Sequence, residues 1–152
     1  MHIFYLDEIP QGQTVKINDI KELHHMINVL RVNPNEIIEI IYGRGSMFSG
    51  VVDSINPKQA ILNIKERKYF DRNNVHFSLT VACSLIKTDK MELAVENLTE
   101  LGVDKIIFLE TERSQLKIKE FEKKIDRLKK ISIFALKQSA NIFLPKIEFM
   151  IF

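Results

Sequence analysis

The second half of the sequence alternates between apolar runs and helical patterns, and this alternation limits the possible folds more than any other feature. Residues 77–86 form a nearly continuous apolar run, as expected of a strand buried on both faces. Asp89 has capping-box spacing to a glutamate three residues later, ahead of a helix that Gly102 is placed to end. A second apolar strand at 105–109 and a long helix over about 119–140 follow. This order predicts a parallel sheet built from right-handed crossovers.

The first 70 residues show a different pattern, one of short strands and turns. A helix is predicted to begin near Asn18-Asp19, which can cap it. Its apolar residues recur at spacings of three and four, at Ile20, Leu23, Ile27 and Leu30. Strands are predicted at 2–6, 14–17, 37–42, 47–52 and 60–64. Five short strands with a single helix predict a compact β-barrel.

A polar stretch, residues 65–74, separates the two patterns. We therefore predict two domains, residues 1–72 and residues 73–152. The fold class is β followed by α/β.

Basic residues are concentrated in one segment of the chain. Residues 113–137 hold nine Lys and Arg against three Asp and Glu, whereas residues 73–112 hold three against seven. Residues 1–72 are balanced, with nine of each sign. A positive surface attracts polyanions such as RNA through phosphate contacts. A helix face rich in lysine and exposed only to solvent would give the same count, so both interpretations stay open.

Several classes of protein are excluded by what the sequence lacks. No stretch approaches the roughly 20 consecutive apolar residues that cross a bilayer, and Asp7 and Glu8 lie where a signal peptide would be basic and then apolar. We expect a cytoplasmic protein without membrane association. Cys83 is the single cysteine, so neither an internal disulfide nor a cysteine zinc cluster is possible. His24 and His25 point about 100° apart on a helix and cannot form a metal site by themselves.

Two loops of the second domain form a candidate binding site. Ligands of open parallel sheets gather beyond the carboxyl ends of the strands, here residues 87–90 and 110–114. Arg113 can pair with a phosphate through two hydrogen bonds, and Thr111 and Ser114 can donate to one. The alternative is that these polar residues only cap the next helix and pair with one another.

Two arginines of the first domain are further candidates for phosphate contacts. Arg31 and Arg44 lie at the ends of predicted barrel elements. A loop for a nucleotide cofactor is missing, because only one of the five glycines follows residue 50 and such loops are usually rich in glycine. From the residues alone, the chain is a two-domain protein with a possible RNA-binding role.

A series of motifs adds a more specific indication. In chain order these motifs are His24-His25, Val29-Leu30-Arg31, Tyr42-Gly43-Arg44-Gly45, Lys90-Met91-Glu92-Leu93, Thr99-Glu100-Leu101-Gly102-Val103, Leu109-Glu110-Thr111-Glu112-Arg113-Ser114, Gln138-Ser139 and Leu144-Pro145-Lys146-Ile147. With them the chain resembles the RsmE family, bacterial enzymes that methylate N3 of a uridine in 16S ribosomal RNA with S-adenosylmethionine.

The resemblance implies a PUA-like RNA-binding barrel over residues 1–72 and the first half of a SPOUT-type α/β domain over residues 73–152. It implies a homodimer with a trefoil knot near the C-terminus of the full-length enzyme, where the knot forms the cofactor pocket. The family's glycine-rich loop of that pocket does not occur in this sequence. We therefore expect the chain to end before the knot, to bind no cofactor alone and to be inactive alone.

The resemblance also suggests roles for individual residues. Small-subunit ribosomal RNA is the expected partner, held by Arg31 and Arg44 and, through substrate phosphates, by Arg113, Ser114 and Gln138. No catalytic residue can be identified. Where the family often has Gly-Arg after Gln-Ser, this chain has Ala140-Asn141, which weakens the case for a phosphate contact there. The alternatives are a non-catalytic RNA-binding module and an inactive fragment.

Overall fold

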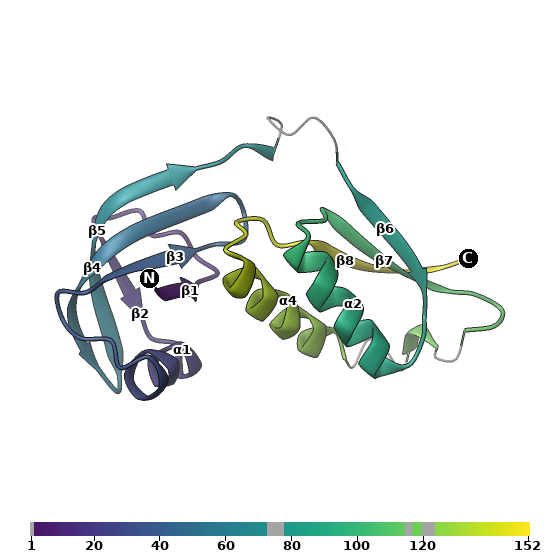
Figure 1. The fold of residues 1–152 in the computed structure, drawn as a ribbon, viewed down its shortest axis with the longest axis horizontal. Coiled ribbons are helices and arrows are strands. Elements are labelled where there is room, and N and C mark those ends of the chain that lie inside the picture. Colours follow the sequence, from purple (N-terminus) through teal and green to yellow (C-terminus); the bar gives the residue numbers. More distant parts are fainter. Residues whose placement is uncertain (1, 73–77, 115–116, 120–123) are drawn as a thin grey trace. The chain divides into compact units, whose positions relative to one another are not determined.

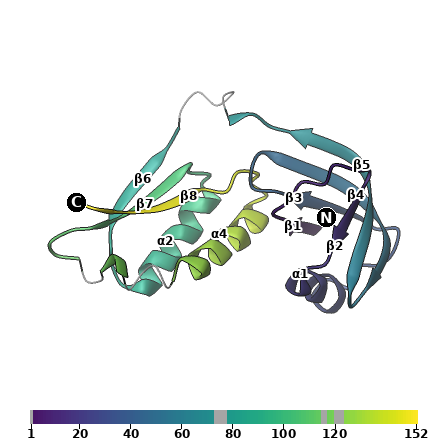
Figure 2. The same cartoon turned by 180° about the vertical axis from the view of Figure 1, so that it is seen from behind.

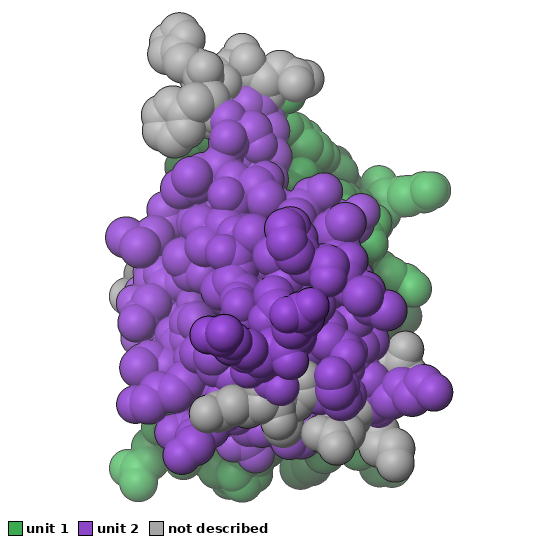
Figure 3. Space-filling view, turned by 90° about the vertical axis from the view of Figure 1, so that its right-hand side faces the viewer, with its two compact units in different colours: residues 1–71 green, residues 72–152 purple. Residues whose placement is uncertain are grey.

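The chain divides into two compact units, residues 1–71 and residues 72–152 (Figures 1 and 3). The computed structural model describes residues 2–72, 78–114, 117–119 and 124–152. The division falls in the polar stretch 65–74, whose residues 73 and 74 lie outside the described part. Residue 77, the first of the predicted apolar strand, also lies outside it.

Unit 1 is built on one five-stranded sheet with the order β1-β3-β4-β5-β2. Its strands are β1 (His2–Tyr5), β2 (Thr14–Ile17), β3 (Ile37–Ile41), β4 (Ser46–Asn56) and β5 (Gln59–Tyr69). β1 and β3 are parallel, and the other neighbours are antiparallel. In this order β1 and β2 are the edge strands of the sheet, at the two ends of the predicted barrel wall.

The long strands β4 and β5 are curved (Figures 1 and 2), and their pairing contains two register shifts. One shift lies between Ser49 and Gly50. A Cβ added to Gly50 would lie 2.9 Å from the Asn63 carbonyl oxygen, so a larger residue does not fit there. Such irregularities increase the local twist and bend a strand. The alternating burial along β2 and β4 then directs one face of the curved sheet into a core. Its largest buried side chains are Phe4, Ile17, Ile38, Ile40, Tyr42, Phe48, Met26 and Leu62.

The predicted helix of unit 1 consists of α1 (Ile20–His24) and a π-helical turn, η1 (His25–Val29). The predicted cap is confirmed, because the Asp19 carboxylate accepts hydrogen bonds from the N–H groups of Lys21 and Glu22 at 3.0 and 2.9 Å. The predicted apolar face is wrong in part. Ile20, the first residue of α1, is exposed, and in the π-helical turn it is Met26 that is buried.

Unit 2 is a three-stranded parallel sheet with two long helices. The strands β6 (Thr80–Ser84), β7 (Lys105–Glu110) and β8 (Lys146–Ile151) pair in this order. The helices α2 (Thr88–Glu100) and α4 (Ile125–Ser139) cover one face of the sheet (Figures 1 and 2). The core between sheet and helices holds Met91, Val95, Ile106, Phe108 and Leu128.

Three predictions for unit 2 need correction. β6 is a half-covered edge strand, not a strand buried on both faces, because Thr80, Ala82 and Ser84 are exposed. The capping box at Asp89 is wrong, because α2 begins at Thr88 without a side-chain cap. No strand was predicted after residue 145, but Lys146–Ile151 forms the strand β8.

The ends of the helices agree better with prediction. Gly102 lies directly after the last turn of α2 with φ +75°, a conformation that favours glycine. The Gly102 N–H donates to the Thr99 carbonyl and the Val103 N–H to the Leu98 carbonyl, which is the Schellman arrangement. The long helix is confirmed over 125–139, while residues 120–123 of the predicted range lie outside the described part.

Candidate nucleic-acid interface

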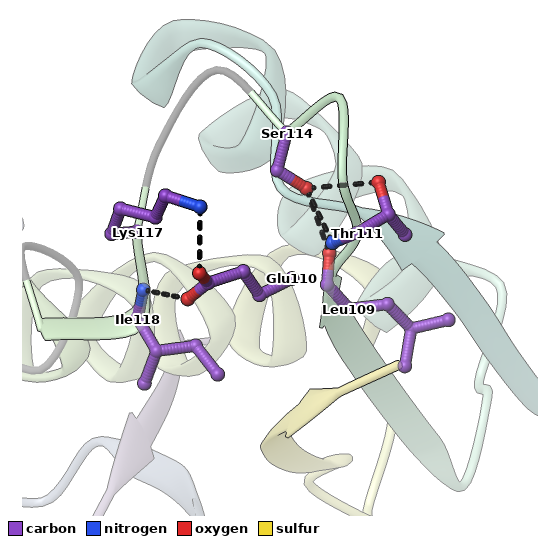
Figure 4. Close-up of polar contacts among 6 residues, drawn as sticks. All are labelled: Leu109, Glu110, Thr111, Ser114, Lys117 and Ile118. Atoms are coloured by element: carbon purple, nitrogen blue, oxygen red, sulfur yellow. Dashed lines mark hydrogen bonds and ion pairs between the residues drawn. The ribbon is translucent and has the colours of Figure 1, made fainter.

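The first candidate surface lies beyond the carboxyl end of β7, where residues 110–114 turn away from the sheet. The Thr111 N–H donates to the Ser114 hydroxyl oxygen at 2.7 Å (Figure 4). The same oxygen lies 3.1 Å from the Thr111 hydroxyl and 3.3 Å from the Leu109 carbonyl oxygen. Ser114 therefore holds the loop in shape, as the alternative interpretation of this sequence expected, and its hydroxyl would have to exchange a partner to bind phosphate.

Glu110 connects this loop to the segment that follows. Its carboxylate accepts from the Ile118 N–H and from the Lys117 ammonium group, both at 2.9 Å (Figure 4). The pKa of Glu110 lies below its ordinary value. The hydrogen bond from Ile118 is the largest cause, and the contact with Lys117 is the next. Glu110 is thus a structural anion, and a carboxylate with a lowered pKa is a poor general base.

Arg113 is the residue of the loop that is open to a ligand. Its side chain is exposed and has no ion-pair partner within the described ranges. Lys87, directly before α2, and Lys90, in its first turn, are exposed at the same edge of the sheet. The helix N-terminus carries partial positive charge that would favour an anion, but the exposed carboxylates of Asp89 and Glu112 offset part of it.

The basic segment 113–137 is only partly available to a polyanion. Arg127 pairs with Glu92 of α2 at 2.5 Å, and Lys124 donates to the Thr88 hydroxyl at 2.7 Å. Lys129 and Lys130 are exposed on α4. The acidic side of α2 therefore neutralises part of the charge that the sequence assigns to this helix.

Gln138 is not brought together with Arg113 and Ser114. It is exposed in the last turn of α4, next to a segment in which the Asn141 side chain donates to the carbonyl oxygens of Thr99 and Glu100 at 3.0 and 2.9 Å. These carbonyls end α2, at the amino edge of the sheet. Gln138 and Ser114 thus lie at opposite ends of unit 2.

The second candidate surface is the turn between β3 and β4 in unit 1. Arg44 is exposed there, and the flanking Gly43 and Gly45 have φ of +66° and +81°. The two glycines adopt the left-handed backbone angles that the tight turn requires, and Arg44 lies exposed between them. Arg31 is exposed as well, with φ +53°, but it precedes β3 while Arg44 follows it, so the strand separates the two arginines.

Arg44 lies close to a tyrosine of β1. The Tyr5 hydroxyl donates to the Asp7 carboxylate at 2.9 Å. Burial, and then the hydrogen bond to Asp7, raises the pKa of Tyr5 to about 12, while the positive charge of Arg44 acts in the opposite direction. The Arg44 guanidinium is therefore near enough to this pair to interact with it electrostatically.

Sequence reasoning missed two aromatic residues beside this turn. Tyr69 and Phe70 are 64% and 45% exposed, and the Phe70 N–H donates to the Gly45 carbonyl at 2.7 Å. They belong to the polar stretch 65–74, which was interpreted only as a domain boundary. The usable signal was the sequence Lys65-Glu66-Arg67-Lys68-Tyr69-Phe70, in which aromatic residues directly follow basic ones.

Metal and membrane sites find no support in the described residues. Among them no three His, Cys, Asp or Glu side chains are grouped as metal ligands would be, and no helix is long and apolar enough to cross a membrane. The Asn28 side-chain nitrogen lies 3.0 Å from His24 Nδ1, and the His25 ring packs edge-on against Phe4.

Comparison with known proteins gives a consistent assignment for both units. Residues 73–151 match the model of an RNA methyltransferase domain, and residues 17–65 match that of an RNA methyltransferase PUA domain. The chain is 28% identical over 140 residues to ribosomal RNA small subunit methyltransferase E 2 of Borreliella burgdorferi, covering 91% of this chain and 57% of that protein. It is 27% identical over 146 residues to ribosomal RNA small subunit methyltransferase E of Rickettsia conorii, covering 96% and 57%.

Solved structures resemble the chain over nearly its whole length. Ribosomal RNA small subunit methyltransferase E from Neisseria gonorrhoeae, bound to S-adenosyl methionine, superposes with a TM-score of 0.83 at 28% identity, covering 99% of this chain and 62% of that one. A probable rRNA-methyltransferase from Porphyromonas gingivalis superposes with a TM-score of 0.84 at 28% identity, covering 99% and 60%. The chain thus spans less than two thirds of the length of these relatives.

Proposed function

The chain belongs to the RNA methyltransferase family, with relatives of the RsmE type as its motifs indicated, and from this membership we propose that it is the RNA-docking part of a ribosomal RNA methyltransferase. The reaction we propose for the whole protein is transfer of a methyl group from S-adenosylmethionine to N3 of a uridine in 16S ribosomal RNA. The observation that carries the proposal is the match of both units, in the family's order, to RNA methyltransferase domains.

We extend the proposal to the architecture of the whole enzyme. Unit 1 is a PUA-like RNA-binding barrel, and unit 2 is the first half of a SPOUT-type domain that dimerises and forms a C-terminal knot. The parallel order β6-β7-β8, with both helices on one face, is compatible with such a domain. A cytoplasmic location fits an enzyme that acts on ribosomal RNA.

The described residues do not fit a methyl-donor pocket. The hydroxyls of Thr111 and Ser114 at the carboxyl edge lie within hydrogen-bond distance of each other, and each oxygen of the Glu110 carboxylate already has a partner in Ile118 or Lys117. Gly102, which alone among the glycines follows residue 50, ends α2 at the opposite edge. We therefore derive no step through the donor and propose that this chain alone does not bind it.

The chain's own residues would orient the RNA. Arg44 and Arg31 of unit 1 would contact backbone phosphates, and Arg113 would do so beyond β7, supported by the loop that Ser114 stabilises. Gln138, at the far end of unit 2, would contact a different part of the RNA. Phosphate contacts position a nucleic acid without reading its sequence, so they suit a docking role.

RNA binding at several salt concentrations tests this proposal. A fluorescent fragment of 16S ribosomal RNA should bind the chain, and the double substitution Arg31→Ala with Arg44→Ala should weaken binding. It should also flatten the slope of log K against log salt by about 1.4 to 1.8, since each lost phosphate contact contributes about 0.7 to 0.9. Lys58→Ala, at an exposed lysine in the β4–β5 turn, is the control and should change the affinity little.

Titration with S-adenosylmethionine tests the proposal that this chain alone does not bind the methyl donor. No heat of binding is expected from this chain. Micromolar binding would contradict the claim that its residues do not form the donor pocket. In the RNA-binding experiment, an affinity that does not change with salt or with loss of the two arginines would contradict the docking role.

A non-catalytic RNA-binding module remains the second candidate function. It is favoured by the loop at residues 110–114, whose polar groups mostly satisfy one another. The two functions differ in one result: only the first requires that a longer protein containing this chain methylates ribosomal RNA.

A further inference from the structure

We propose that unit 1 binds an unpaired nucleotide of RNA at the turn between β3 and β4, with the base stacked on Tyr69 and the adjoining phosphate paired with Arg44. The inference rests on the proposed RNA-docking function and deepens it, because it names the kind of RNA and the residue that would select it.

The Tyr69 ring contacts Phe48 on one side and is exposed to solvent over most of its surface. The Phe48 ring meets it edge to face, with ring centroids 5.7 Å apart, and Phe48 itself is buried. Tyr69 is nevertheless 64% exposed. An aromatic ring that is fixed at its base and open to solvent loses little conformational freedom when a planar ligand stacks on it.

The cluster beneath Tyr69 is aromatic and positively charged. Phe48 also packs against Tyr42, with centroids 4.9 Å apart, and the Arg67 guanidinium lies 4.9 Å from the centre of the Phe48 ring. Arg67 further donates to the Gly12 carbonyl, which fixes its position. The charge of Arg67 therefore stays at this site and favours an anionic ligand.

One buried polar group at this site has no partner within the described part of the chain. The Tyr42 hydroxyl makes no hydrogen bond, although the side chain is only 1% exposed. Burial raises the pKa of Tyr42, and the charges of Arg67 and Tyr69 act on it more weakly and in opposite directions. Buried polar groups are rarely left without a partner, so this hydroxyl marks the cluster beneath Tyr69 as atypical of a purely structural core.

The strand pairing brings the turn that carries Arg44 next to Tyr69. Ser46 is paired with Tyr69 across β4 and β5, and Gly45 accepts a hydrogen bond from Phe70. Arg44 therefore lies two residues from the partner of Tyr69. An exposed arginine in a turn that adjoins an exposed aromatic ring suits the alternation of phosphate and base along a single strand.

Single-stranded RNA is favoured over the alternatives by this combination. In a duplex the bases are stacked on one another, and their faces are not open to a side chain. A protein partner would also cover an aromatic surface, but it would not require the cations of Arg44 and Arg67. The test therefore compares single-stranded RNA with duplex RNA of the same sequence.

The experiment measures binding of the full chain to a short RNA that carries 2-aminopurine at an internal position. Stacking on an aromatic ring changes the fluorescence of this base. We expect the wild-type chain to prefer the single strand to the duplex. Tyr69→Ala should weaken binding about five- to 150-fold and abolish the fluorescence change, because one base–aromatic stack contributes about 1–3 kcal/mol.

Two variants separate stacking from structure. Tyr69→Phe keeps the ring and should keep both affinity and fluorescence change. Phe134→Ala removes an aromatic residue of α4 that is 55% exposed, and it should leave both unchanged. Circular dichroism of each variant checks that the fold is kept, and a misfolded Tyr69→Ala is replaced by Tyr69→Leu, which removes the aromatic ring but keeps an apolar side chain.

The outcomes distinguish this inference from the proposed function. If Arg44→Ala weakens binding but Tyr69→Ala does not, or if duplex binds as well as single strand, the stacking site is wrong and the docking role stands. If no RNA binds at all, both are wrong.

Discussion

At the scale of the residue, the Tyr42 hydroxyl is buried without a hydrogen-bond partner among the described residues. Tyr42→Phe removes this group and keeps the ring that packs on Phe48. We expect the variant to be more stable in urea by about 1 kcal/mol, because a buried polar group without a partner carries a desolvation penalty. Phe48→Leu is the contrasting change and should destabilise. A loss of stability in Tyr42→Phe would indicate that the hydroxyl has a partner such as bound water.

A second residue-scale prediction concerns how the stabilisation from Glu110 changes at low pH. The pKa of Glu110 is lowered by the hydrogen bond from Ile118 and then by Lys117. Since the pKa is lower in the folded state, the stabilisation from Glu110 is present above the ordinary glutamate value of about 4.3 and is lost as the pH falls through the folded value. The amide resonance of Ile118 should shift in this acid range. In Glu110→Gln, which accepts a hydrogen bond but does not titrate, that shift should be absent.

At the scale of the element, the end of α2 depends on the backbone of one residue. Gly102 has φ +75°, so Gly102→Ala should destabilise unit 2 by about 1 kcal/mol through strain. Gly12→Ala is the matched control, since an added Cβ there meets nothing within 4 Å. Thermal unfolding followed by circular dichroism measures both. Equal midpoints for the two variants would mean that the left-handed conformation at Gly102 carries no cost.

Elements were predictable where a local pattern determines them. Asp19 and Gly102 mark helix ends through contacts with their own neighbours, and both were identified from sequence. The burial of β6 was not, because an apolar run does not reveal whether a second layer of helices covers the sheet. β8 was missed for a related reason: Lys146–Ile151 becomes a strand by pairing with β7, a partner distant in sequence.

The candidate site was predictable only in part. Arg44 and Arg113 were identified because arginine in a turn or at a strand end is visible in the sequence. The separation of Gln138 from Ser114 follows from the direction of α4 against the sheet, which no local pattern contains. Tyr69 was missed because it lies in a mostly polar stretch, and its importance depends on pairing with Ser46 across two strands.

At the scale of the whole molecule, the two units have separate cores. The buried cluster of unit 1 includes Phe4 and Phe48, and that of unit 2 includes Phe108. Phe108→Ala should cost unit 2 about 3–5 kcal/mol and broaden its methyl resonances, while those of unit 1 stay in place. Phe4→Ala is the matched variant with the opposite expectation. Simultaneous loss of both sets of resonances in either variant would show that the units unfold as one.

The strand pairing of unit 1 has a consequence for how the protein is made. Every strand pair of its sheet lies within residues 2–69, so all partners have been translated long before β8 emerges. Domains generally fold as units during synthesis, N-terminal ones first. We therefore expect nascent chains stalled late in translation to carry a finished unit 1, with Arg44 and Tyr69 already in position, while unit 2 still lacks its third strand.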